Sequence, residues 1–255
     1  MSTRTPTIGG NWKMNLHKAE AIELAAALAA KADDFAGVEV TVFPAFPYLI
    51  PVADALAPAG GKIKLGAQDA YITPNGAFTG EVSLSMIQDA GASVLLVGHS
   101  ERRHVIGETD ILVNDKVLAG LEAGLDVVLA IGETLEQRES GKTDAINTGQ
   151  LGYGLAGVTA EQMKRITIAY EPVWAIGTGK TATPEDAQKA HSVIRQAVAF
   201  LYDQGIADAV RIQYGGSMKP GNAGDLLAQT DIDGGLIGGA ALKPDDFAGI
   251  IAAAK

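Results

Sequence analysis

Eight short β-rich runs alternate with eight segments of helical composition along the whole chain, and this alternation strongly limits the possible folds. Strands that alternate strictly with helices pair in parallel, and apolar strand runs indicate burial on both faces of the sheet. The predicted strands are Thr7–Trp12, Glu39–Phe43, Lys62–Gly66, Val94–Val97, Asp126–Ile131, Ile166–Tyr170, Val210–Tyr214 and Gly234–Ile237.

The predicted helices between these strands begin, in places, with recognisable signals. Thr183 offers an N-cap hydroxyl, Pro184 suits the first helical position, and Glu185 and Asp186 favour the positive end of the helix dipole. The predicted helical segments are Lys18–Phe35, Tyr48–Ala57, Ser83–Asp89, Asp110–Ala123, Thr143–Arg165, Thr183–Asp203, Pro220–Thr230 and Pro244–Ala254.

This alternation fits two architectures, an open doubly wound sheet and a closed barrel. Eight βα units in 255 residues are typical of a (β/α)8 barrel, which we therefore predict. No Pro/Gly/Ser-rich linker, charge block or low-complexity tract interrupts the series, so we expect one α/β domain over residues 1–255. In such a barrel the chemistry lies at the carboxyl ends of the strands and in the loops that follow.

The composition argues against several classes of protein. A formal net charge of −10 disfavours a nucleic-acid-binding surface, since clustered Lys and Arg grip phosphate backbones. The absence of cysteine rules out disulfides, thiolate nucleophiles and Cys-ligated metals, and fits a reducing compartment. Residues 1–7 lack the apolar core of a signal peptide, and no apolar stretch is long enough to span a membrane, so we expect a cytoplasmic protein.

Polar residues suited to acid–base chemistry lie at the ends of three predicted strands. Asn11 and Lys13 belong to the first, His99 and Glu101 to the fourth, and Glu171 to the sixth. Together they support proton transfer, and no spacing of His and carboxylates indicates a metal site. A single Lys or Glu is more often solvated surface, and His99 could equally be a core histidine. We interpret the other histidines as structural, because they lie in helical or pre-helical segments: His17, His104 and His191.

Glycines follow the last two predicted strands. Gly215, Gly216 and Ser217 follow the seventh strand, and Gly238 and Gly239 follow the eighth. Without a Cβ atom, the backbone N–H groups of glycine can approach a ligand closely, and barrels commonly hold phosphate at this place. Glycines alone could be turns. Together with the acid–base residues they predict a small phosphorylated substrate.

The segment after the sixth strand contains two misleading motifs. Gly179-Lys-Thr181 resembles the end of a P-loop, but Trp174 stands where that motif requires glycine. A loose dinucleotide fingerprint that begins at Gly177 fails because Glu171–Ile176 separates it from the strand. We therefore expect no nucleotide cofactor, and we predict a mobile lid over residues 172–182 with a stiff beginning at Pro172–Trp174.

Five motifs, spread over the whole chain, resemble those of the triosephosphate isomerase family. The resemblance implies a TIM barrel that interconverts dihydroxyacetone phosphate and glyceraldehyde 3-phosphate in glycolysis and gluconeogenesis, with neither cofactor nor metal. The motifs are Asn11-Trp-Lys-Met-Asn15, Val97-Gly-His-Ser-Glu-Arg-Arg103, Ala169-Tyr-Glu-Pro-Val-Trp-Ala-Ile-Gly-Thr-Gly-Lys-Thr181, Tyr214-Gly-Gly-Ser217 and Gly234-Gly-Leu-Ile-Gly-Gly-Ala240.

The resemblance also implies a role for each site residue. Glu171 would be the base that moves a proton between two adjacent carbons. His99 would be a neutral imidazole, its pKa lowered by the N-terminus of a short helix that begins at Ser100. Asn11 and Lys13 would hold the enediolate oxygens. The remaining implied roles are Glu101 as the partner that positions Lys13, and the backbone N–H groups of Gly177, Ser217, Gly238 and Gly239 as phosphate ligands.

The family is typically dimeric, through a loop that reaches a pocket near the neighbour's active site. Residues Thr73–Glu81 resemble that loop, so the resemblance implies a homodimer with Phe78 and Thr79 as contacting residues. Two departures from the family pattern concern packing. Ala130 replaces a usual cysteine, and Asp69 stands where Gln-Asn is common after the third strand, which leaves the interface detail open.

Two other functions compete with this interpretation. Another phosphate-binding barrel, such as an epimerase or a synthase, needs different chemistry at the strand ends and would not explain the intact lid. A non-catalytic adhesion or scaffold protein on an isomerase fold predicts loss of catalytic residues, yet the four implied ones are all present: Asn11, Lys13, His99 and Glu171.

Overall fold

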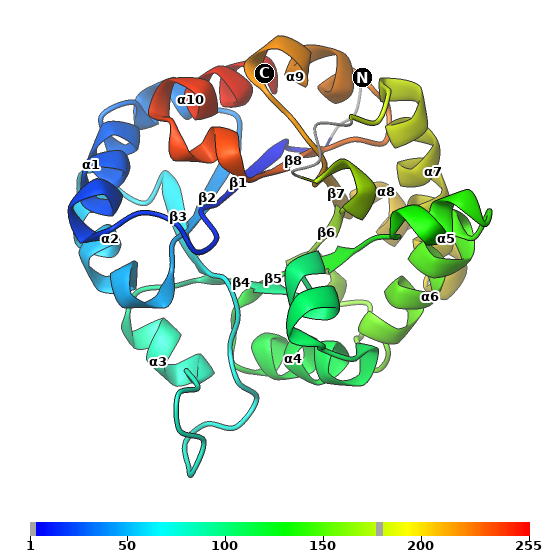
Figure 1. Ribbon diagram of the computed structural model, residues 1–255, viewed down its shortest axis with the longest axis horizontal. Coiled ribbons are helices and arrows are strands. Elements are labelled where there is room, and N and C mark those ends of the chain that lie inside the picture. The colour runs from blue at the N-terminus through cyan, green and yellow to red at the C-terminus, as the bar shows by residue number, and fades with distance from the viewer. Residues whose placement is uncertain (1–3, 177–180) are drawn as a thin grey trace.

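A computed structural model describes residues 4–176 and 181–255, and its eight strands close into a barrel in the order β1 to β8 (Figure 1). All neighbouring strands pair in parallel, and β1 pairs with both β2 and β8. The predicted (β/α)8 barrel is therefore confirmed. The strands are β1 (Thr7–Asn11), β2 (Glu39–Phe43), β3 (Ile63–Ala67), β4 (Val94–Val97), β5 (Asp126–Ile131), β6 (Ile166–Tyr170), β7 (Arg211–Tyr214) and β8 (Gly234–Ile237).

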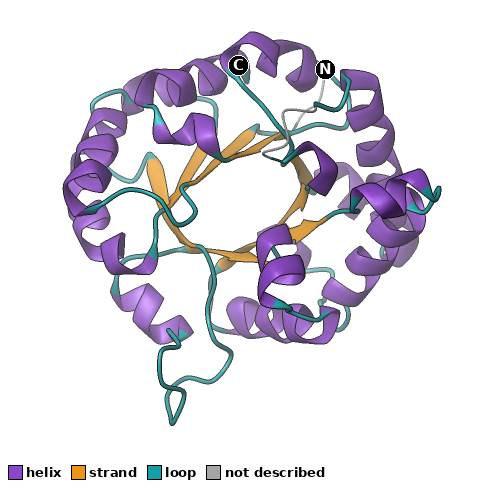
Figure 2. Ribbon diagram, viewed as in Figure 1, coloured by secondary structure: helices purple, strands orange, loops and turns teal. Residues whose placement is uncertain are grey.

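Helices surround the barrel as an outer ring (Figure 2). No helix in the described residues has the length and apolar character that a membrane crossing requires. The helices are α1 (Lys18–Ala29), α2 (Leu49–Leu56), α3 (Leu84–Asp89), α4 (Asp110–Glu122), α5 (Leu135–Glu139), α6 (Thr143–Gly154), α7 (Pro184–Leu201), α8 (Gln204–Ala209), α9 (Pro220–Leu227) and α10 (Pro244–Ala253).

Alternating strand residues divide between two apolar layers. Leu95 and Val97 of β4 belong to the large core between strands and helices, whereas Leu96 belongs to a separate small cluster inside the barrel. This division follows from the period of two in a β-strand. Ala130, where the resemblance leads us to expect cysteine, lies in the interior cluster and is fully buried.

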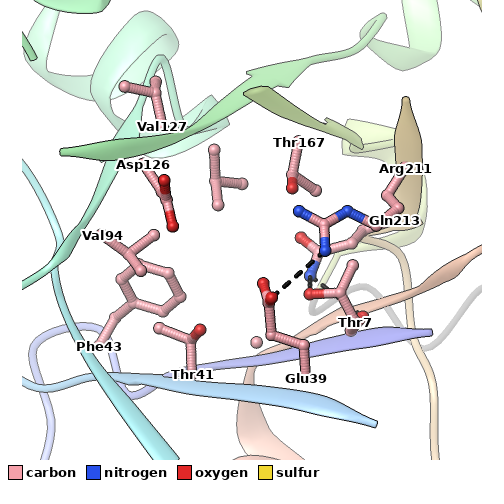
Figure 3. A pocket seen from close by; sticks show the side chains of 12 residues that line it. Thr7, Glu39, Thr41, Phe43, Val94, Asp126, Val127, Thr167, Arg211 and Gln213 are labelled. Carbon is pink, nitrogen blue, oxygen red and sulfur yellow. Dashed lines mark hydrogen bonds and ion pairs between the residues drawn. The ribbon is translucent and has the colours of Figure 1, made fainter. Parts of the chain in front are cut away.

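Ion pairs surround the amino-terminal end of the barrel. Lys64 contacts Glu39 at 3.2 Å and Asp126 at 3.1 Å, and Arg211 contacts Glu39 at 3.3 Å. Figure 3 shows Glu39, Asp126 and Arg211 around a space of about 10 Å³ at this end. The space enclosed by these side chains is therefore too small for a substrate.

Several predicted helix boundaries are wrong, most clearly in the segment Thr143–Arg165. Its helix α6 ends at Gly154, where an added Cβ would lie 2.8 Å from the Leu129 side chain, and Gly157 then takes a φ of +77° that a continuing helix does not allow. The short helix α5 was not predicted, although Thr134 and Gln137 form a capping box that the sequence displays.

Candidate active site

A cavity of about 690 Å³ opens at the carboxyl ends of the strands, where the sequence places the site. Glu101 lies beside it and contacts Lys13, whereas Gly177 lies outside the described residues. The cavity brings together side chains and glycines from β1, β4, β6, β7 and β8 and the loops that follow. The sequence-predicted residues that line it are Asn11, Lys13, His99, Glu171, Ser217, Gly238 and Gly239.

Glu171 follows β6 directly and is only 2% exposed. Its Oε2 atom accepts the Ser100 backbone N–H at 2.7 Å, and its Oε1 atom lies 2.9 Å from His99 Nε2. Glycine is needed around it, because a Cβ atom at Gly215 would lie 2.8 Å from the Glu171 Cγ atom and one at Gly132 would lie 1.7 Å from its carbonyl oxygen. The carboxylate is thus both buried and held in a defined position.

The hydrogen bonds of His99 fix its tautomer when the ring is neutral. The backbone N–H of Glu101 donates to His99 Nδ1 at 3.2 Å, so Nδ1 must carry a lone pair. The proton of the neutral ring then lies on Nε2, from which it is donated to Glu171. A neutral imidazole with an N–H directed into the cavity can donate a hydrogen bond to a carbonyl oxygen.

The contact between Glu171 and His99 shifts both pKa values. Burial acts to raise the pKa of Glu171, but His99, the Ser100 N–H and Lys13 outweigh it and hold the pKa below its ordinary value. Burial acts to lower the pKa of His99, but the Glu171 carboxylate outweighs it and raises that pKa. The predicted lowering of the His99 pKa is therefore wrong for this arrangement. The physical reason is that the carboxylate contacts the imidazole, while the N-terminal N–H of Ser100 is directed to Glu171.

We predict that Glu171→Gln lowers the pKa of His99. The substitution removes the negative charge that raises this pKa and leaves the burial that lowers it, so the ring should lose its proton at a lower pH. NMR titration of ¹⁵N-labelled histidine would measure the change. His191 serves as an internal control, because burial lowers its pKa to about 3 and its Nδ1 atom contacts the Asp231 carbonyl. An unchanged or raised His99 pKa would contradict the prediction.

Lys13 is held from three directions. Its backbone N–H donates to Asn11 Oδ1 at 2.9 Å, its carbonyl accepts from Gln68 Nε2 at 2.8 Å, and its Nζ atom lies 2.6 Å from Glu101 Oε1. A Cβ atom at Gly238 would lie 3.9 Å from Lys13 Nζ, so the ammonium group sits against the glycines after β8. The Lys13 ammonium group thus places a fixed positive charge at the point where an anion would bind, although the protein as a whole is acidic.

The beginning of the predicted lid is anchored by Glu133, a fully buried residue that sequence reasoning missed. Glu133 accepts hydrogen bonds from Trp174 Nε1 at 2.8 Å and from the Tyr170 hydroxyl at 3.2 Å. The Arg138 guanidinium lies 4.3 Å from the centre of the Trp174 ring. These contacts agree with a stiff beginning at Pro172–Trp174. Residues 177–180 of the predicted lid lie outside the described residues.

Asp69, the second departure from the family pattern, belongs to a buried charge cluster beside the site. It contacts Lys116 at 2.6 Å and Arg102 at 2.8 Å, and both cations also contact Glu108. The negative charges of Asp69 and Glu108 balance the positive charges of Lys116 and Arg102, and buried charges require such pairing. The burial of Asp69 raises its pKa, against the opposing effect of Lys116.

Sequence reasoning also missed polar residues around the cavity, since nothing in their local sequence separates them from exposed surface. Lys219, Lys243 and Asp246 line it, and Ser100 contributes its backbone N–H to Glu171. In residues 4–176 and 181–255, no group of three or more His, Asp or Glu side chains could hold a metal ion.

Comparison with known proteins gives one consistent result. The family model described as triosephosphate isomerase matches residues 6–254. A triosephosphate isomerase of Carboxydothermus hydrogenoformans is 52% identical over 97% of this chain and 98% of its own length. The triosephosphate isomerase of Chlorobaculum tepidum is 52% identical over 96% of this chain and 99% of its own length. The triosephosphate isomerase of Geotalea uraniireducens is 50% identical over 97% of this chain and 98% of its own length.

Proposed function

The chain belongs to the triosephosphate isomerase family, and we infer that it interconverts dihydroxyacetone phosphate and D-glyceraldehyde 3-phosphate. The observation that carries this inference is a buried carboxylate, Glu171, in contact with the imidazole of His99 inside a cavity of about 690 Å³. We propose that the reaction is a proton transfer that needs no cofactor or metal.

We propose that Glu171 is the base. Its carboxylate takes a proton from the carbon that bears the hydroxyl group of dihydroxyacetone phosphate, which leaves an enediolate. The protonated Glu171 then returns the proton to the adjacent carbon, the former carbonyl carbon, to give glyceraldehyde 3-phosphate. Because both carboxylate oxygens contact Ser100 and His99, Glu171 must leave these partners to reach a bound substrate.

The departure of Glu171 releases the N–H of His99 Nε2 for the substrate. We propose that this group donates to the carbonyl oxygen and then moves a proton between the two oxygens of the enediolate. The Lys13 ammonium and the Asn11 amide favour the negative charge that develops there. Glu101 contacts Lys13 at 2.6 Å, which supports a positioning role for this carboxylate.

The phosphate group of the substrate requires local donors, since the chain carries a net charge of −10. We propose that the backbone N–H groups of Ser217, Gly238 and Gly239 bind it, together with Gly177, which lies outside the described residues. Support comes from Gly239, where an added Cβ would meet no atom within 4 Å, so the backbone there is open to a ligand.

The decisive experiment is a coupled assay of glyceraldehyde 3-phosphate conversion by the purified chain after exhaustive treatment with a chelator. Fast turnover would support both the reaction and its independence from metal. If a folded preparation showed no turnover, the non-catalytic scaffold function would replace the proposed one.

We also propose that the chain forms a homodimer through the loop at residues 73–81, which projects from the barrel between β3 and α3 (Figure 1). Phe78 is 40% exposed, and its ring centre lies 4.6 Å from that of Tyr71. Other large apolar side chains close to this loop in the sequence are also exposed. Met86 lies on α3, Val105 and Ile106 come before α4, and Ile111 lies in the first turn of α4. Exposed apolar groups of this kind favour a protein partner.

We predict that Phe78→Glu produces a monomer with activity reduced about tenfold or more, because a carboxylate cannot be buried unpaired in an apolar interface. Sedimentation velocity and the coupled assay would measure the two effects. The matched control is Phe200→Glu on α7, since Phe200 is 90% exposed and outside the proposed interface. A dimer with full activity from the Phe78 variant would contradict the proposed interface.

Two further expectations remain proposals. We propose that residues 1–255 form one domain, since the barrel takes its first strand near the amino terminus and its last near the carboxyl terminus. We also propose a cytoplasmic location, which a sequence without cysteine supports.

A further inference from the structure

The backbone of Lys13 has a conformation that non-glycine residues seldom adopt. Its φ is +53°, and Leu16 is the other non-glycine residue with a positive φ in the part of the chain that the structure describes. This region costs energy because the Cβ atom approaches the carbonyl oxygen, and it persists only where surrounding contacts impose it. The contacts of the Lys13 backbone therefore determine where its ammonium group lies.

The carbonyl group of Lys13 is held by Gln68, which follows β3 directly. Gln68 Nε2 donates to the Lys13 carbonyl at 2.8 Å and to the Phe43 carbonyl at 2.8 Å. Phe43 is the last residue of β2, and its carbonyl also accepts the Trp12 N–H at 3.1 Å. One amide group thus joins the loop after β1 to the end of the neighbouring strand.

The chemistry of this contact demands a primary amide. Two carbonyl oxygens need two N–H donors on one nitrogen, which glutamine supplies and which methionine or ionised glutamate does not. Gln68 has no place in the proposed chemistry itself, because it is not among the residues that line the cavity.

We propose that Gln68 is a positioning residue for Lys13. Its amide holds the Lys13 backbone in the left-handed conformation and so keeps the ammonium group between Glu101 and Gly238. Glu101 fixes the same side chain from its charged end, whereas Gln68 fixes it from the backbone. This inference rests on the proposed role of Lys13 in stabilising the enediolate.

The test is a double-mutant cycle in the coupled assay with glyceraldehyde 3-phosphate. Gln68→Met should lower kcat/KM about 10- to 100-fold, because a displacement of about 1 Å at a catalytic group has effects of this size. Combined with Lys13→Met, which leaves no ammonium group to position, the same change should lower kcat/KM less than about threefold. Gln68→Glu should lower kcat/KM as Gln68→Met does. Because glutamate has nearly the same shape as glutamine, this variant can replace Gln68→Met in the test if the Met variant does not fold.

Gln88→Met is the matched control, because Gln88 Nε2 also donates to a backbone carbonyl, that of Ala123 at 2.8 Å, far from the cavity lining. It should keep the wild-type kcat/KM. If the Gln68 change caused equal losses with and without Lys13, Gln68 would have a general structural role and the proposal would be overturned. Full activity of both Gln68 variants would also overturn it. If Lys13→Met alone kept the wild-type rate, the proposed role of Lys13 would fail as well, which separates the two hypotheses.

Discussion

Glu171→Asp should lower kcat about 100-fold while the fold and the affinity for phosphate stay nearly unchanged. The shorter side chain withdraws the carboxylate by about 1 Å, and a displacement of this size at a reacting group can cost on the order of 10²-fold. Glu171→Gln, which removes the base altogether, should lower kcat by about 10²- to 10⁴-fold. Steady-state kinetics in both directions, with inorganic phosphate as a competitive inhibitor, would measure rate and affinity separately.

The packing around Glu171 makes the comparison of Glu171→Asp with the wild-type chain informative. Gly215 and Gly132 approach the backbone and the Cγ atom of residue 171 closely, so the backbone has little room to shift and compensate for a shorter side chain. Glu185→Asp is a suitable control, since it makes the same chemical change in the exposed first turn of α7. An unchanged rate for Glu171→Asp would exclude Glu171 as the base.

Lys13→Met should lower kcat/KM by about 10²- to 10³-fold, the size of effect seen when one group that stabilises a developing negative charge is removed. Methionine keeps most of the length of the side chain and removes only its charge. The loss should appear in kcat as well as in KM, because the charge on the substrate oxygens is greater in the enediolate than in the ground state. Rates over a range of substrate concentrations would separate the two parameters.

Lys62→Met is the control for the loss of one positive charge. Lys62 is exposed and pairs with Asp33, so its removal changes the net charge equally without altering the cavity. If the Lys13 variant lost activity only through KM, Lys13 would bind the phosphate equally in the ground state and in the transition state. That role would explain the result better than stabilisation of the enediolate.

Much of the fold and most of the candidate site could be read from local sequence. The strands were predicted within a residue of their observed ends, since each is a short β-rich run that recurs between helical segments. His99 and Glu171 were identified because a polar residue just after the carboxyl end of a buried strand indicates function in this architecture. Helix ends were predicted less well, and α6 shows why: Gly154 matters because it packs against Leu129, which lies on a different element.

The architecture can be predicted from the order of the residues alone, because the alternation of strand and helix and the burial of each face are properties of short segments. The same order also determines which chemical groups are available at the strand ends. The pKa values and positions of these groups depend on contacts that form in the folded chain. The pKa of His99 is raised because Glu171, 72 positions along the chain, lies 2.9 Å away, and Lys13 is contacted by Gln68 and Glu101 from the segments that follow β3 and β4. Electrostatic and hydrogen-bond effects depend on distance in space, so no local pattern can report them.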